Sequence, residues 1–355
     1  DWVKDGVDIG TPAPSGTGVS SIASFTAENL GNTPITSTFT VTPRTQDGLT
    51  CLGDAITFDI TVNPSPLNMT NQTATVCSDE QIGVILPTTD GDGLAITSYD
   101  ITANVDEDLT GDATVGTQTA SDAISTDSFN NVTNASHDVV YTITPYNGTC
   151  AGDQFTVTVT TDPEPVYTGD LDATVCSDEA IGVVLPTSDD DGLGIASYDI
   201  SADVDGDLSG TATTGSGETD ENAISGDIFT NLTNGPLDVV YTIIPYSDEN
   251  CAGDSFDITV TIDPEPVYTG DLSKSVCSDE IIAVTLPDLD DDDGDITKYD
   301  ITAVVASGLT GTATSGTDIT DVNEIYNDVF NNVTNGPLTV VYTITPYFGT
   351  CAGTN

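Results

Sequence analysis

The sequence predicts an all-β protein made of tandem immunoglobulin-like β-sandwich domains. Three observations support this prediction: a unit of about one hundred residues recurs, its segments alternate apolar and polar residues, and helical periodicity is absent. The motif Val-Cys-Ser-Asp-Glu recurs at Cys77, Cys176 and Cys277, which lie 99 and 101 residues apart. A repeat of this length fits one small domain per unit, so the chain should be an array of like domains.

The repeat positions divide the chain into four segments. Residues 1–66 align with the C-terminal part of a repeat, and residues 67–165 and 166–266 are complete β-sandwich repeats. Residues 267–355 are a further β-sandwich repeat that should lack its last strand. We expect the chain to be an excerpt of a longer molecule, because the first half of its opening repeat is missing.

Proline marks the joints between segments, at residues 63–66, 162–165 and 263–266. The first joint reads Asn-Pro-Ser-Pro, and the other two read Asp-Pro-Glu-Pro. Because proline fixes φ and favours extended backbone, these joints should be stiff. We therefore expect the domains to form an extended rod.

Strands within each repeat follow from residues that alternate with period two. Residues 139–146 and 154–161 are rich in β-branched side chains, as half-buried strands require. Shorter strands are predicted at 73–77, 82–86 and 96–103, separated by turns rich in Asp and Gly. About seven such strands per repeat are typical of a two-sheet sandwich.

The chain is strongly acidic, with 58 acidic residues, 4 basic ones and a net charge of −54. Such a charge repels nucleic acid and anionic membrane surfaces, so neither is an expected partner. No apolar run approaches the roughly 20 residues of a membrane-spanning helix, so we expect no direct membrane insertion of this segment. At 37% hydrophobic residues, each repeat has enough apolar content to fold around a modest core.

Seven cysteines predict disulfide bonds and an oxidising compartment outside the cytoplasm. Pairing within repeats would join Cys77 to Cys150, Cys176 to Cys251 and Cys277 to Cys351, with Cys51 paired outside the segment. Pairing across joints would join Cys51 to Cys77, Cys150 to Cys176 and Cys251 to Cys277. We favour pairing within repeats, because a strand of eight residues spans roughly 26 Å and should separate the partners of the alternative.

Acidic loops at equivalent places in the repeats are candidate calcium sites, because Ca²⁺ prefers oxygen ligands on flexible loops. The alternative is that they are solvated turns, since the EF-hand spacing is absent. The acidic residues of the joints could also hold Ca²⁺ between domains. The candidate ligands are Asp90, Asp92, Asp189, Asp190, Asp191, Asp290, Asp291 and Asp292 in the loops, and Asp162, Glu164, Asp263 and Glu265 in the joints. No cofactor is required otherwise.

Catalysis is not expected, and no catalytic residue is assigned. The single histidine, His137, occurs in one repeat and is predicted to be a surface loop residue, so no repeated nucleophile–histidine pair can form. Asn-x-Ser/Thr sequons would suit a glycosylated surface protein, although chance explains most of them in a chain rich in Asn and Thr. They begin at Asn68, Asn71, Asn131, Asn134, Asn147, Asn231 and Asn332.

The recurrent motifs resemble a known repeat type. Val-Cys-Ser-Asp-Glu-x-Ile-x-Val-x-Leu-Pro, Phe-x-Asn-Val/Leu-Thr-Asn, Val-Val-Tyr-Thr-Ile-x-Pro-Tyr and Cys-Ala-Gly are similar to the PKD-like repeats of very large cell-surface adhesins of Bacteroidetes. The SprB-type gliding-motility adhesins use long arrays of such repeats. The resemblance implies type IX secretion, outer-membrane attachment, and a filament that contacts the motility or secretion machinery and a substratum or surface polysaccharide. Residues 1–24 match the repeats poorly.

Two functions follow as expectations. The favoured one is a mechanical stalk of a cell-surface adhesin filament, active in surface adhesion and gliding motility. The alternative is a passive structural or carbohydrate-binding surface array without a motility role. Tyr99, Tyr198 and Tyr299 recur at matching sites, but they lie in strand segments and are predicted to be core residues.

Overall fold

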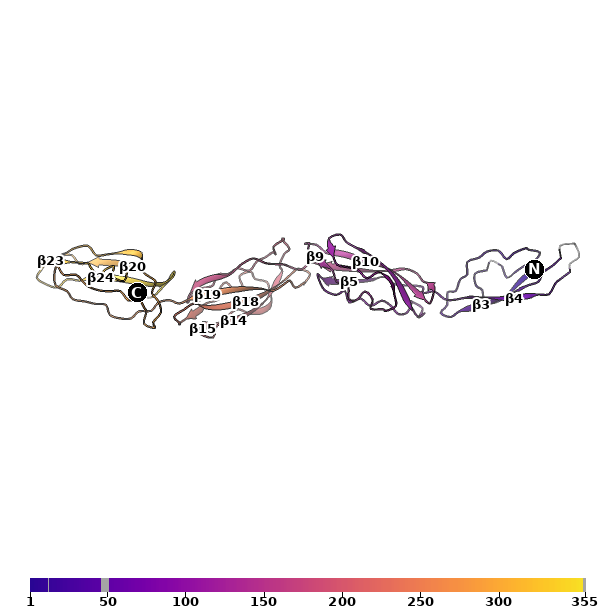
Figure 1. The fold of residues 1–355 in the computed structure, drawn as a ribbon, viewed down its shortest axis with the longest axis horizontal. Coiled ribbons are helices and arrows are strands. Elements are labelled where there is room, and N and C mark those ends of the chain that lie inside the picture. The colour runs from indigo at the N-terminus through magenta and orange to yellow at the C-terminus, as the bar shows by residue number, and fades with distance from the viewer. Residues whose placement is uncertain (12, 46–50, 354–355) are drawn as a thin grey trace. The chain divides into compact units, whose positions relative to one another are not determined.

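The computed structural model describes residues 1–11, 13–45 and 51–353, and these residues form strands and turns without any helix. This confirms the predicted all-β fold, whose strands Figure 1 traces along the chain. Two compact units are present, Asp1–Glu164 and Pro165–Asn355. Each unit contains sheets from two consecutive predicted segments.

The first unit begins with a four-stranded sheet of order β2-β1-β3-β4. Its strands are β1 (Trp2–Gly6), β2 (Ser15–Gly16), β3 (Ile35–Val41) and β4 (Ile56–Val62). β1 pairs antiparallel with β3, and Trp2 packs on Phe39 with ring centroids 5.9 Å apart. The poorly matching residues at the start of the chain therefore supply an ordered strand.

The second sheet of this unit has the order β5-β12-β10-β6-β8, and β11 also pairs with β10. A separate two-stranded sheet pairs β7 with β9. The strands are β5 (Gln72–Cys77), β6 (Ser98–Val105), β7 (Leu109–Thr110), β8 (Gly116–Gln118), β9 (Asn130–Asn131), β10 (His137–Asn147), β11 (Cys150–Ala151) and β12 (Phe155–Asp162).

The second unit contains the corresponding sheet β13-β19-β18-β14-β16 and the shorter sheet β22-β20-β24-β25, which among the described residues lacks the parallel pair of first and last strands. Small sheets pair β15 with β17 and β21 with β23. The strands of the first repeat are β13 (Ala173–Cys176), β14 (Ser197–Val204), β15 (Leu208–Gly210), β16 (Gly215–Glu218), β17 (Phe229–Asn231), β18 (Leu237–Tyr246) and β19 (Phe256–Asp263). Those of the second are β20 (Lys298–Val305), β21 (Leu309–Thr310), β22 (Gly316–Ile319), β23 (Asn331–Asn332), β24 (Val340–Phe348) and β25 (Cys351–Ala352).

The first and last strands of each complete repeat lie side by side and run in parallel. β5 pairs with β12 from Gln72 opposite Val157 to Cys77 opposite Asp162. β13 pairs with β19 in the same way, and Cys176 lies opposite Asp263. The cysteine that ends the first strand therefore lies at the end of the domain where the chain leaves it.

Each repeat has its own apolar core, built from inward-facing residues of the alternating strands. The recurrent tyrosines Tyr99, Tyr198 and Tyr299 are at most 2% exposed, which confirms that they are core residues. The predicted strand at 82–86 is wrong. Instead of a ladder, its backbone N–H groups bond to the turn at 121–127, with Ile82 donating to the Asp127 carbonyl and Leu86 to the Ser121 carbonyl. Both side chains still face the core, which explains the strand-like pattern.

One position in this extended segment distinguishes the third copy from the other two. Gly83 and Gly182 have positive φ angles of 64° and 68°, and the equivalent Ala283 has φ 48°. A side chain at positive φ costs about 1 kcal/mol, so Ala283→Gly should stabilise the last domain by about that amount. Urea denaturation measures the change. Ala306→Gly, at a position without positive φ, is the control and should not stabilise; equal effects of the two variants would contradict the prediction.

Candidate functional site

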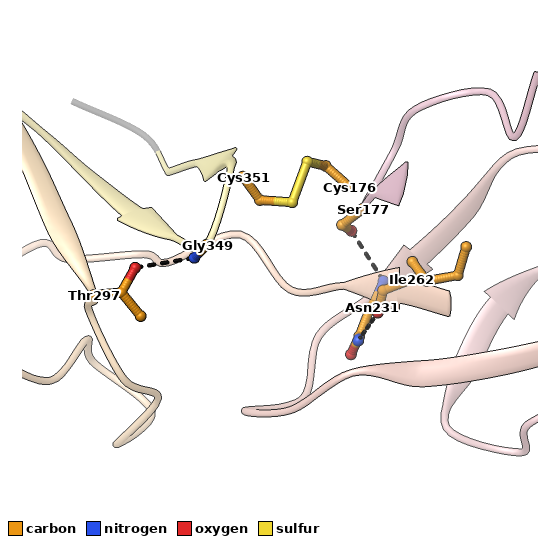
Figure 2. The surroundings of a disulfide bond; sticks show 7 residues. All are labelled: Cys176, Ser177, Asn231, Ile262, Thr297, Gly349 and Cys351. Carbon is orange, nitrogen blue, oxygen red and sulfur yellow. Dashed lines mark hydrogen bonds between the residues drawn. A yellow bond between two sulfur atoms is a disulfide. The ribbon is translucent and has the colours of Figure 1, made fainter. Parts of the chain in front are cut away.

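The joint between the repeats 166–266 and 267–355 carries a disulfide bond between Cys176 and Cys351, with Cα atoms 5.4 Å apart (Figure 2). Cys176 ends β13, and Cys351 begins β25. Cys77 and Cys251 are disulfide-bonded as well, whereas Cys51, Cys150 and Cys277 are free. Disulfide bonding is thus confirmed, but its pattern differs from the expected one.

Both expected pairing schemes are wrong for the cysteines of this joint. Cys176 pairs with neither Cys251, its partner within the repeat, nor Cys150, its partner across the preceding joint. Cys351 does not pair with Cys277, which is free. Cys77 is bonded while Cys150 is free, so these two are not joined either. The pairing of Cys51 outside the segment stays a prediction.

The direction of the first strand explains the error. Because β13 runs parallel to β19, Cys176 lies beside Asp263, whereas Cys251 lies before β19 at the other end of that strand. Eight residues of β-strand span roughly 26 Å, far more than a disulfide can bridge. The length of a strand, which was used to favour pairing within the repeat, therefore excludes a Cys176–Cys251 bond.

Hydrogen bonds hold both cysteine-bearing segments in place (Figure 2). The Asn231 backbone N–H donates to Ser177 Oγ at 2.9 Å, and Asn231 Nδ2 donates to the Ile262 carbonyl at 2.7 Å. On the other side, the Gly349 N–H in the turn before Cys351 donates to Thr297 Oγ1 at 2.9 Å. The disulfide thus joins two segments that are each fixed to their own domain.

Glycine in the recurrent Cys-Ala-Gly motif lets this turn approach the joint closely. A Cβ atom on Gly353 would lie 1.9 Å from the Pro266 carbonyl oxygen, and one on Gly253 would lie 1.9 Å from the Pro165 oxygen. Only glycine fits without moving backbone atoms. The end of each Cys-Ala-Gly motif therefore lies directly against the last proline of the preceding joint.

The acidic loops also anchor the joints, through hydrogen bonds that sequence reasoning missed. Asp290 accepts backbone N–H bonds from Val267, Asp292 and Gly294. Asp291 accepts bonds from the N–H and hydroxyl of Thr269, at 2.8 and 2.5 Å. Each loop is thereby tied to the first residues that follow its joint.

The equivalent loops repeat this arrangement. Asp189 bonds Val166 and Asp190 bonds Thr168, while Asp90 accepts the Leu67 N–H at 2.9 Å. Burial alone would raise the pKa of Asp90, but backbone N–H bonds, that of Leu67 the strongest, outweigh it and hold this pKa below its ordinary value. These carboxylates are therefore built for accepting amide hydrogen bonds.

The loop of one domain also contacts the preceding domain. Asn234, in the repeat 166–266, donates from Nδ2 to the Asp292 carbonyl in the acidic loop of the next repeat. In the first unit, Asn32 makes the same contact with the Asp92 carbonyl. Two consecutive domains are thus linked by a backbone joint and an amide hydrogen bond, and in the second unit by a disulfide as well.

Acidic groups gather around the joint itself. Burial raises the pKa of Glu265, and the charges of Asp178 and Glu179 raise it further; burial also raises the pKa of Asp263. A carboxyl whose pKa rises on folding destabilises the folded state when it is ionised. The joint therefore carries electrostatic repulsion at neutral pH.

Glu265→Gln should accordingly stabilise the second unit at pH 7. The folded state binds the Glu265 proton more tightly than the unfolded chain, so wild-type stability rises as the pH falls through the raised pKa. The advantage of Gln should shrink over that range, because wild-type Glu265 becomes neutral. Urea denaturation at several pH values measures this, with the exposed Glu249→Gln as control. A variant less stable than wild type at pH 7 would overturn the prediction.

Calcium binding at the acidic loops and joints stays a prediction. Among the described residues, the group of three acidic or metal-binding side chains that lies close enough to share an ion is Asp106, Asp108 and His137. It contains none of the expected calcium ligands. Its carboxylates face different ring nitrogens, with Asp106 Oδ1 3.4 Å from Nδ1 and Asp108 Oδ2 3.9 Å from Nε2, as in an ion pair.

Removal of calcium tests the expectation directly. If Ca²⁺ offsets the carboxylate repulsion at the joints, chelator should lower the melting temperature and added Ca²⁺ should restore it. Differential scanning fluorimetry of the chelated chain, with added Mg²⁺ as control, measures this. An unchanged melting curve would leave these carboxylates as hydrogen-bond acceptors alone.

Three other positions differ from expectation. His137 begins strand β10 and is half-buried, so it is not a surface loop residue. Asn131 and Asn231 are at most 4% exposed, and the Nδ2 of Asn131 donates to the Ala135 and Thr161 carbonyls, both at 2.8 Å. In these two sequons the asparagine side chain has a structural role. The amide nitrogen that glycosylation needs is buried and already donates hydrogen bonds.

A buried polar cluster recurs in all three later repeats. Asp127 accepts hydrogen bonds from the Tyr141 hydroxyl at 2.6 Å and from the N–H and hydroxyl of Thr114 at 2.8 and 2.7 Å. Equivalent bonds join Asp227 to Tyr241 and Thr213, and Asp328 to Tyr342 and Thr314. Burial and the Asp127 charge raise the pKa of Tyr141, so its hydroxyl remains a donor. The recurrence of Asp, Tyr and Thr at equivalent positions of the three repeats was the sequence signal that could have revealed this cluster.

Two solved structures illustrate the comparison with known folds. The chicken CNTN1 FN1–FN3 domains share 12% identity with it at a TM-score of 0.30, with 92% of this chain and 93% of that one covered. Mouse clustered PcdhgC3 EC1–3 shares 9% identity at a TM-score of 0.25, covering 65% and 76% of the two chains. No curated protein matches the sequence. None of the described residues forms a helix that could cross a membrane.

A family model gives the more specific result. The model of the PKD-like domain matches residues 74–165 and 173–266, two tandem copies that together cover more than half of the chain. Both matched ranges coincide with sheets that have the same strand order. The chain therefore belongs to the PKD-like domain family.

Proposed function

We propose that this chain is a repeat segment of a very large secreted cell-surface adhesin filament, acting as a mechanical stalk in surface adhesion and gliding motility. Tandem PKD-like domains and disulfide bonds indicate an extracellular repeat region. Domains of this type are typically structural modules, and we assign the segment no catalytic role. The filament would be attached at the outer membrane after type IX secretion.

The observation that carries the proposal is the joint between residues 166–266 and 267–355. A flexible tether needs no bonds between its domains, whereas this joint has the Cys176–Cys351 disulfide and the hydrogen bond from Asn234 to Asp292. Pro266 of the joint is packed against Gly353. Such a joint suits a part that transmits force from one domain to the next.

The proposed partners follow from this function. One end of the filament would engage outer-membrane motility or secretion machinery, and the other a substratum or surface polysaccharide. The high negative charge would keep neighbouring filaments apart, because like charges repel at short range.

The experiment is live imaging of source cells with a fluorescent antibody against residues 166–266. Label that travels along the cell body, with arrest of gliding when intact antibody blocks the repeat, would support a motility adhesin. An antibody against an unrelated surface protein is the control. Stationary label on cells that still glide would contradict the motility role.

A specific observation favours the alternative, a carbohydrate-binding surface array. Phe58 is 42% exposed and its ring stacks on Phe39 at 5.2 Å, while the neighbouring Ile56 is 65% exposed. An exposed aromatic ring on a strand suits the apolar face of a sugar ring. Binding of the chain to a glycan array, lost in Phe58→Ala, would support this function.

A further inference from the structure

The Cys176–Cys351 disulfide encloses two domains. Its cysteines are 175 residues apart in sequence, and both apolar cores of the second unit lie between them. Cys176 belongs to the first strand of one repeat and Cys351 to the last strand of the next. The bond therefore closes almost the whole second unit into a covalent loop.

The loop is closed across a short distance, because both cysteines lie at the joint. Cys176 is in register with Asp263, the first residue of the joint, and Gly353, two residues after Cys351, packs on Pro266. The Cα atoms of the two cysteines are 5.4 Å apart (Figure 2). Any backbone that unfolds between them stays inside the loop.

We propose that the Cys176–Cys351 disulfide limits how far the second unit can be extended. Without it, unfolding of both domains would let the 175-residue separation extend to about 600 Å. With it, the two cysteines remain within one bond of each other whatever happens to the enclosed strands. A pull on the chain then passes through the bond, and the path between Cys176 and Cys351 keeps its length whether or not the enclosed strands unfold.

The inference rests on the proposed function, in which the segment bears tension, and gives it a specific property. A stalk of ordinary domains lengthens greatly each time one domain unfolds. In this unit the length between the two cysteines is fixed covalently, so the enclosed domains can unfold and refold near their original place. This fixed length depends only on the disulfide between the two repeats.

Single-molecule force spectroscopy of the full chain, held at its two termini, tests the proposal. The other five cysteines are first replaced by serine, so that Cys176–Cys351 is the single remaining bond. Adding Cys176→Ser to this background should then increase the fully extended length by about 600 Å, corresponding to 175 residues. Equal extended lengths for the two chains would overturn the proposal.

A second measurement covers the case in which the multiple variant fails to fold. Unmodified chain is digested with a glutamate-specific protease without reductant, and the cross-linked peptides are identified by mass spectrometry. A peptide pair containing Cys176 and Cys351 is expected, and Cys150→Ser, which removes a free thiol, should leave it unchanged. A peptide pair that joins Cys176 to any other cysteine would refute the proposed limit on extension. Neither result depends on whether cells glide, so the stalk function can fail separately.

Discussion

Replacing Asp127 with alanine should destabilise the first complete PKD-like domain by about 3 kcal/mol. The carboxylate is 7% exposed and accepts three hydrogen bonds, from the Tyr141 hydroxyl and from the N–H and hydroxyl of Thr114. Alanine leaves all three donors without this partner inside the domain. Bonds to a charged acceptor are worth more than neutral ones, so the loss should exceed that of an ordinary polar side chain.

Urea denaturation followed by far-ultraviolet circular dichroism measures this loss. Tyr141→Phe removes one of the three bonds and should cost about 1 kcal/mol. Asp153→Ala changes an exposed aspartate of the same domain and is the matched control. If Asp127→Ala were no more destabilising than Asp153→Ala, the buried cluster would contribute nothing to stability.

Gly253→Ala should disrupt the contact between a domain and the joint that precedes it. The new Cβ would lie 1.9 Å from the Pro165 carbonyl oxygen and 3.2 Å from Pro245 Cγ, so backbone atoms must move. Forced overpacking of this kind costs about 3 kcal/mol where the neighbour is rigid. We expect a loss of that order in the free energy of unfolding.

Urea denaturation and the rate of cleavage near Pro165 by a non-specific protease would measure the effect. Gly226→Ala is the matched control, because a Cβ at that position meets nothing within 4 Å. A Gly253 variant as stable and as resistant as the Gly226 variant would show that the turn is not seated on the proline.

Much of the fold could be predicted because core-facing and solvent-facing residues alternate along the strands, which leaves a period of two in the sequence. The strands near 139–146 and 154–161 and the burial of Tyr99 followed from alternation alone. Residues 82–86 show the limit of that signal. Their side chains alternate between core and solvent as in a strand, but their amides bond to a turn about forty residues away, and no local pattern reports such a partner.

The position of the joint could be predicted from its prolines, but the contacts made there could not. Alternation gives the faces of a strand and not its direction, so the parallel pairing of β13 with β19, which brings Cys176 to the joint, could not be foreseen. The acidic loops were singled out as candidate calcium ligands, and the structure adds backbone amides bonded to Asp90 and Asp290, while calcium binding there stays a prediction. Carboxylates can accept amide hydrogen bonds as well as bind ions, so loop composition alone does not predict these amide partners.

The parallel pairing of first and last strands also determines how a domain meets a pull from its two ends. When the Cys176–Cys351 disulfide is reduced, tension enters at Ala173 at the start of β13 and leaves at Asp263, so the two strands are drawn in opposite directions along their common axis. The four residue pairs of this ladder are then strained together, in shear, whereas an antiparallel hairpin pulled at its open end unzips one bond at a time. Breakage in shear is a single concerted event, so the reduced domain should give way abruptly and at high force.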